Sequence, residues 1–182
     1  MKGVVFTEFI EMVEEKFSPE IADRIISESN LESGGAFTAV GTYDHEEMLE
    51  MVTRLSDITA IPINDLVTDF GEYLFERFTR LYPGFFEGVN SAFEFLDTIE
   101  NHVHVEVRKL YPDAELPNFH VEKPDEQTLI MTYQSNRPFA PLAHGLIQGA
   151  TRYFGEDIHL EMSDLSGGKG GHARFVLTKR SG

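Results

Sequence analysis

The order of the hydrophobic patterns along the chain constrains its fold more than any other feature. Apolar residues recur at helical spacing through the first part of the chain, and β-favouring runs dominate the last part. The patterns predict helices over residues 3–17, 19–29, 44–55, 63–81, 88–111 and 139–154, and strands over 118–121, 128–133, 158–162 and 173–177. Helices followed by strands, with one helix inserted among them, are typical of an α+β fold.

Local signals mark several of these boundaries. Ser18 and Asp44 stand where their side chains can cap a following helix, and Pro19 suits the first helical position. Residues 166–171, Ser-Gly-Gly-Lys-Gly-Gly, predict a flexible hairpin loop between the last two strands. This loop lacks the fixed glycine spacing and the following helix of a phosphate-binding loop, so a connector is the better interpretation.

Tyr133-x-Ser135-x-Arg137 is the segment that most suggests a binding site. It follows the β-favouring run 129–133 and stops at Pro138, which predicts a strand that ends at the proline. Side chains two apart on a strand share a face, so the phenol, the hydroxyl and the guanidinium are expected in one row. Such a row could hold a ligand with two neighbouring carboxylates. The alternative is the polar outer face of a half-buried strand.

Two of the seven histidines lie in the predicted helix 88–111. His102 and His104 are two residues apart, so they point in different directions and cannot chelate one ion together. On a helical wheel His104 lies roughly 80° and His102 roughly 120° from the centre of the apolar stripe, which places His104 nearer the buried face. That stripe consists of Ala92, Leu96, Ile99, Val103, Val107 and Leu110. His104 is therefore the candidate for a single axial metal ligand, unless both histidines simply lie at the surface or the margin of the core.

Three other helices each contribute an apolar pair with a spacing of four residues. Such pairs usually belong to the core, but two glycines lie beside them, and glycine inside a helix costs about 1 kcal/mol relative to alanine. Close approach of another backbone, or a hinge, would be a reason to keep them. The pairs are Val5 with Phe9, Leu74 with Phe78, and Leu142 with Leu146, and the glycines are Gly71 and Gly145.

Composition excludes several classes of function. The net charge of −16 opposes binding to nucleic acid and to anionic lipid, both of which favour basic proteins. The absence of cysteine excludes disulfides, thiolate chemistry and thiolate metal sites. Neither a secretory segment nor an apolar run long enough to span a membrane is present, so we expect a cytoplasmic protein without nucleic-acid or membrane partners.

The chain resembles the haem nitric oxide/oxygen binding (H-NOX) domains, which are related to the haem domain of soluble guanylate cyclase. The resemblance covers nearly the whole chain. It is carried by residues 1–3 (Met-Lys-Gly), 70–72 (Phe-Gly-Glu), 82–86 (Tyr-Pro-Gly-Phe-Phe), His104, 111–112 (Tyr-Pro), Pro117 and Tyr133-x-Ser135-x-Arg137. It implies a single domain over residues 1–182, in which a helical lobe of about 1–60 and a helix-and-sheet lobe of about 61–182 enclose haem b, iron protoporphyrin IX.

The same resemblance assigns roles to the candidate residues. It implies that His104 is the proximal iron ligand and that Tyr133, Ser135 and Arg137 bind the two haem propionates. Pro117 would press on the porphyrin and help to distort it. The three apolar pairs would line the distal side and the edge of the haem.

The resemblance also implies a function. Relatives that bind dioxygen carry a distal tyrosine five residues after the motif arginine, where this chain has Leu142. Because pocket polarity affects which gas binds, we expect ferrous haem that binds nitric oxide and carbon monoxide and excludes dioxygen. Nitric oxide would bind opposite His104, weaken its bond to iron and shift the helix that carries it.

We expect no catalytic activity in the chain itself, and regulation in trans of a histidine kinase, or of a diguanylate cyclase or phosphodiesterase that handles cyclic-di-GMP. The alternatives are a haem enzyme, which the apolar distal set argues against, and an interaction module without a cofactor. The colour of the purified protein would distinguish a haem sensor or haem enzyme from an interaction module without a cofactor.

Overall fold

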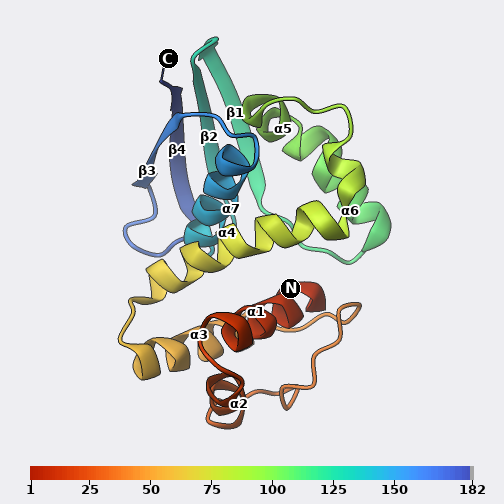
Figure 1. Cartoon of the computed structure of the whole chain (residues 1–182), viewed down its shortest axis with the longest axis vertical. Coiled ribbons are helices and arrows are strands. Elements are labelled where there is room, and N and C mark those ends of the chain that lie inside the picture. Colours follow the sequence, from red (N-terminus) through yellow and green to blue (C-terminus); the bar gives the residue numbers. More distant parts are fainter. Residues whose placement is uncertain (181–182) are drawn as a thin grey trace. The chain divides into compact units, whose positions relative to one another are not determined.

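A computed structural model describes residues 1–180, and these divide into two compact units, one up to Phe70 and one from Gly71 onward. The boundary falls inside α4 (Ile63–Leu81), one continuous helix whose bounds match the prediction. The lobe boundary expected near residue 60 stays a prediction. Figure 1 shows the order of the elements along the chain.

The first unit is helical. It contains α1 (Gly3–Lys16), α2 (Pro19–Ser27), α3 (His45–Thr59) and the start of α4. The two predicted caps are confirmed: the Ser18 hydroxyl accepts a hydrogen bond from the Ile21 amide, and the Asp44 carboxylate accepts one from the Glu46 amide. Both satisfy backbone donors that the first turn of a helix leaves without a partner. Phe9 of α1 is fully buried, and its ring contacts Phe70 with centroids 5.2 Å apart.

The second unit is built on an antiparallel sheet with the strand order β1-β2-β4-β3. Its strands are β1 (Asn118–Asp125), β2 (Thr128–Gln134), β3 (Ile158–Asp164) and β4 (His172–Lys179), and α7 (Ala140–Tyr153) lies between β2 and β3 in the chain. Alternate residues of β2 and β4 are buried, so one sheet face forms the core. The buried residues that α7 adds to this core are Ala140, Ala143, Ile147 and Ala150. The observed architecture confirms the α+β prediction.

The segment between α4 and the sheet is less regular than the sequence predicts. A single helix was expected over residues 88–111. The structure instead has η1 (Pro83–Phe86), a 3-10 turn, followed by α5 (Ala92–Asp97), η2 (Ile99–Val103) and α6 (His104–Leu110). Because η2 is a π-helix, the regular helix of the prediction is wrong in this segment.

Gly71 brings two helix backbones of the second unit together. A Cβ atom on Gly71 would lie 2.5 Å from the Leu142 carbonyl oxygen and 2.8 Å from the Gly145 Cα atom. Real Cβ atoms do not approach other atoms so closely, so only glycine permits this contact between α4 and α7. The structure thus supports close approach as a reason for Gly71, whereas its use as a hinge stays a prediction.

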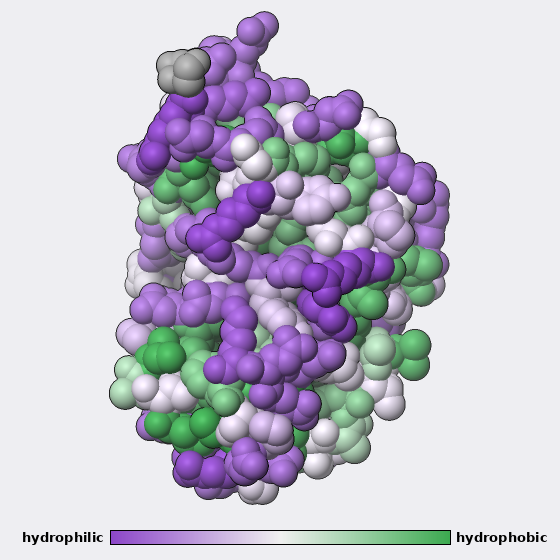
Figure 2. Space-filling view, in the orientation of Figure 1, coloured by the Kyte–Doolittle hydropathy of each residue, from purple (hydrophilic) through white to green (hydrophobic). Residues whose placement is uncertain are grey.

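The chain's polarity is visible on its surface. Hydrophilic and hydrophobic side chains both reach the face drawn in Figure 2, and charged residues make up 25% of the chain. Among residues 1–180, no helix is both long enough and apolar enough to cross a membrane.

Candidate functional site

A π-helical turn, η2, directly precedes His104. Within it the Val103 amide donates to the carbonyl of Thr98, five residues back, and the His104 amide donates to that of Ile99. Each such turn holds one residue more than an α-helical turn, so the apolar stripe loses its phase by about 100°. Leu110, predicted on the stripe, is 56% exposed as a result. The ranking of the histidines is nevertheless confirmed, since His104 is buried and His102 is exposed.

The His104 ring is held through one of its nitrogens. Its Nδ1 lies 3.0 Å from Oε1 of Glu100, one turn earlier. A carboxylate can only accept, so Nδ1 carries the proton and the lone pair of Nε2 remains for a metal. Burial lowers the pKa of His104 below its ordinary value, although the Glu100 carboxylate acts in the opposite direction. Burial favours the neutral imidazole, which is the form that binds iron, and the contact with Glu100 orients the ring.

Glu100 makes a second contact with the same oxygen. Its Oε1 also accepts a hydrogen bond of 2.9 Å from the amide of Phe119 in β1. The Phe119 ring lies between two site residues, with its centroid 6.1 Å from that of His104 and 5.6 Å from that of Tyr133. Sequence reasoning missed both Glu100 and Phe119. The spacing of four residues between Glu100 and His104 was the available signal, because such pairs are neighbours on a helix.

The Tyr-x-Ser-x-Arg segment is a turn and not a strand row. β2 ends at Gln134, so Ser135 and Arg137 lie beyond the strand, and the predicted end at Pro138 is wrong. The Ser135 hydroxyl accepts a 3.1 Å hydrogen bond from the Arg137 amide, and the Tyr133 hydroxyl donates to the Arg137 carbonyl at 3.4 Å. Short hydroxyl-to-backbone bonds of this kind stabilise turns. The three side chains are thus gathered by the turn and not by strand alternation.

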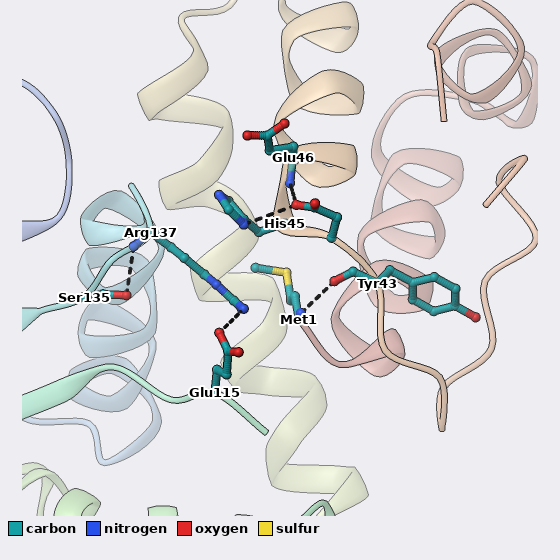
Figure 3. A network of polar contacts seen from close by, with 8 residues as sticks. Met1, Tyr43, His45, Glu46, Glu115, Ser135 and Arg137 are labelled. Atoms are coloured by element: carbon teal, nitrogen blue, oxygen red, sulfur yellow. Dashed lines mark hydrogen bonds and ion pairs between the residues drawn. The ribbon is translucent and has the colours of Figure 1, made fainter. Parts of the chain in front are cut away.

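Tyr133 and Arg137 differ in their surroundings. Tyr133 is 2% exposed, and this burial raises the pKa of its hydroxyl, which therefore stays protonated and able to donate. The Arg137 guanidinium is 18% exposed and forms an ion pair with Glu115, with 2.5 Å between Nη2 and Oε2 (Figure 3). Glu115 itself is 77% exposed. The carboxylate of this exposed glutamate reaches the Arg137 guanidinium, so the guanidinium is placed where it can bind a carboxylate.

A pocket of about 740 Å³ opens beside this turn. Ser135 and Arg137 line it, together with Lys169 and His172 from the β3–β4 connection and the start of β4. Basic and hydroxyl groups in the lining suit an anionic ligand group. The size of the pocket and its donors fit the carboxylate end of a larger molecule.

The glycine-rich connection 166–171 is a hairpin loop, as predicted, but it is internally bonded. The Asp164 carboxylate accepts from the Ser166 hydroxyl and from the amides of Ser166 and Gly168, and these bonds lower its pKa. The loop also holds the motif turn, because the Ser135 amide donates to the Gly171 carbonyl at 2.9 Å and the Ala140 amide to the Gly170 carbonyl at 3.0 Å. Its function is therefore to support the turn backbone on one side.

We expect Gly170→Ala to destabilise the protein more than Gly168→Ala. Both glycines have positive φ, so alanine is strained at each, but only the Cβ at position 170 would meet the Pro138 backbone, at 3.0 Å from its oxygen. The added overpacking should cost about 1–3 kcal/mol. Thermal unfolding of the two variants measures the difference, and equal midpoints would contradict the supporting role of the loop.

The remaining predicted residues lie on three helices and one loop. Leu74 and Phe78 are on α4, and Leu142 and Leu146 are on α7, where the contact made by Gly71 lies between them. Val5 and Phe9 lie on α1 in the first unit. Pro117 is half-buried in the connection before β1. The structure thus brings together His104 with the Tyr133 region through Phe119, and α4 with α7 through Gly71.

These donors fit a haem group. The second unit supplies a buried imidazole with an available Nε2, and a turn whose guanidinium group pairs with a carboxylate. Comparison with known proteins decides the family: the model of the family described as "Haem-NO-binding" matches residues 2–162.

The chain belongs to the haem-NO-binding, or H-NOX, family.

Solved H-NOX structures share its fold. The Fe(II) unliganded H-NOX protein from K. algicida is 39% identical and has a TM-score of 0.94, with 100% of this chain and 98% of that chain covered. The H-NOX protein from Shewanella woodyi, solved in an Fe(II)CO state with the compound IWP-051 bound, is 36% identical with a TM-score of 0.83, covering 99% of this chain and 95% of that one. H-NOX proteins bind haem iron, so haem is the cofactor of this family.

A longer curated relative is soluble guanylate cyclase gcy-35 from Caenorhabditis elegans, which is 24% identical over 165 residues. The match covers 84% of this chain but only 23% of that protein. The chain therefore spans less than a quarter of the length of that cyclase.

Proposed function

We propose that this H-NOX domain senses nitric oxide and carbon monoxide, excludes dioxygen and regulates a separate signalling enzyme. The observation that carries the proposal is His104, a buried imidazole whose Nδ1 is bonded to Glu100 and whose Nε2 is therefore oriented for iron. Bound haem would supply the ferrous iron to which the gas binds. The name of the family and the Fe(II)CO state of the S. woodyi relative support these two gases as ligands.

The motif turn would hold the haem by its propionates. Arg137 would give up Glu115 for a propionate, because an exposed ion pair is worth at most about 1 kcal/mol. Tyr133 and Ser135 would donate their hydroxyl protons to the remaining carboxylate oxygens. Pro117, in the connection that leads into β1, would press on the porphyrin.

The selectivity against dioxygen would come from side chains without a donor. Val5, Phe9, Leu74, Phe78, Leu142 and Leu146 are all hydrocarbon, so none can donate a hydrogen bond to a bound gas. Dioxygen depends on such a donor more than nitric oxide or carbon monoxide does. His144, a polar neighbour on α7, packs instead against Phe175 of the sheet, with ring centroids 5.9 Å apart.

We expect the reduced protein to keep its ferrous, five-coordinate absorption spectrum in the first minutes after air is admitted, and Leu142→Tyr to bind dioxygen under the same conditions. Tyrosine places a hydroxyl donor at the position where dioxygen-binding relatives carry one. Leu142→Phe is the matched control, because it has the same ring without the hydroxyl. Stable dioxygen binding by the unaltered protein would contradict the proposed selectivity.

The output would pass to a partner in trans, a histidine kinase or an enzyme of cyclic-di-GMP turnover. The support is the family resemblance. The experiment adds the ferrous protein, with and without nitric oxide, to the purified kinase or cyclic-di-GMP enzyme encoded beside it and follows that enzyme's rate. A rate that is the same in both cases would count against that enzyme as the partner.

A further inference from the structure

We propose that Glu100 is a positioning residue that sets the strength of the iron–His104 bond and connects that ligand to β1 through Phe119. The inference rests on the proposed ligation of haem by His104. The inference adds Glu100 to the site, although Glu100 itself does not bind the iron. Its basis is the double contact of one carboxylate oxygen.

The geometry leaves Glu100 little freedom. The same oxygen, Oε1, accepts from His104 Nδ1 at 3.0 Å and from the Phe119 amide at 2.9 Å. One donor lies on the helix that follows Glu100, and the other lies in a strand, 19 residues from Glu100 in the chain. Glu100 is 29% exposed, against 10% for the His104 side chain, so the shared bonds face partly away from water. Two fixed donors on one oxygen determine the position of the carboxylate.

The chemical consequence concerns the other ring nitrogen. A carboxylate that accepts the Nδ1 proton increases the electron density of the imidazole and makes Nε2 a stronger ligand. It also fixes the tautomer and the orientation of the ring. Glu100 would thereby strengthen the bond that nitric oxide has to break, and so set how readily the sensor responds.

The mechanical consequence concerns the sheet. Glu100 and His104 lie at η2, the π-helical turn, and π-helical turns are frequent at functional sites. Phe119 pairs in register with Tyr133 across β1 and β2, and their rings are in contact. Movement of the His104 ring would pull on Glu100, and the Phe119 amide would report that movement at the strand next to the propionate-binding turn.

Glu106 on α6 provides a matched control. It lies on the same helical segment and pairs with Lys109 at 2.7 Å, on the exposed side. The hydrogen bond of its carboxylate goes to Lys109, and not to His104 or β1. Glu106→Gln therefore removes one negative charge from the segment without changing the double contact.

The experiment compares Glu100→Gln, Glu100→Ala and Glu106→Gln. In the haem-free proteins, hydrogen exchange of the Phe119 amide is expected to rise about 10-fold or more in Glu100→Ala, since a bond to a charged acceptor is lost. In the haem-loaded proteins, the iron–histidine stretching frequency in the resonance Raman spectrum is expected to fall in Glu100→Gln, because a neutral amide is the weaker acceptor. Glu106→Gln should match the unaltered protein in both measurements.

The outcomes separate the two claims. An unchanged stretching frequency in Glu100→Gln overturns the effect on the ligand, and unchanged Phe119 exchange in Glu100→Ala overturns the connection to β1. If the unaltered protein takes up no haem, the proposed function fails and the effect on the ligand fails with it. The exchange measurement in the haem-free protein would then still decide whether Glu100 fastens β1.

Discussion

Replacing His104 with glycine is expected to abolish the five-coordinate ferrous spectrum and to weaken haem binding by more than about 100-fold. Changes to residues that only orient a metal ligand cost about 10–100-fold in metal affinity. Loss of the ligand itself should therefore cost more. His104 is 8% exposed, so the substitution removes a buried imidazole. Titration of the haem-free variant with haem, followed by its Soret absorption, measures the loss.

A neighbouring residue controls for the substitution itself. His102→Gly removes an exposed imidazole two residues earlier, within η2, and should leave haem binding unchanged. Free imidazole added to His104→Gly should restore the five-coordinate spectrum, since the cavity left by the side chain can accept it. Normal spectra from His104→Gly without imidazole, or loss of haem from His102→Gly alone, would show that the wrong histidine has been assigned.

Replacing Arg137 with alanine is expected to accelerate haem dissociation by about 10–100-fold. A hydrogen bond to a charged group contributes about 1.5–3 kcal/mol, and the guanidinium is the only full positive charge among the three motif side chains. Transfer of haem to an excess of an acceptor apoprotein gives the dissociation rate. Arg137→Lys should recover only part of the effect, because lysine lacks the planar fork that pairs with carboxylates.

Two variants make this result specific to the turn. Arg152→Ala removes an arginine of α7 that likewise pairs with a glutamate, Glu72, but is 71% exposed and lies outside the motif. It should leave haem dissociation unchanged. Glu115→Gln should not accelerate dissociation, because it removes the carboxylate that competes for Arg137. Equal rates in the Arg137 and Arg152 variants would contradict propionate binding by the motif.

The regular elements of the fold could be predicted because their signals are local. The side-chain oxygens of Ser18 and Asp44 cap the helices that they precede, and α4 begins and ends at the predicted residues. The alternating burial of β2 follows from apolar residues at every second position. These patterns depend only on the neighbouring sequence, so no tertiary information was needed.

The details of the site could not be predicted from periodicity. A wheel with a fixed angle per residue cannot represent the π-helical turn at Ile99–Val103, so it placed Leu110 on the buried stripe, although that residue is exposed. The end of β2 at Gln134 depends on bonds from the Gly170–Gly171 backbone, which come from a distant part of the chain. The contact between Glu100 and Phe119 likewise joins a helix to a strand.

The most direct test of the account is the visible absorption spectrum of the purified, reduced protein before and after nitric oxide is added. We predict an intense Soret band of five-coordinate ferrous haem that shifts when nitric oxide binds, and that is missing from His104→Gly. A haem-reconstituted protein that remains colourless, or a Soret band that nitric oxide leaves unchanged, would contradict haem-based gas sensing by this chain.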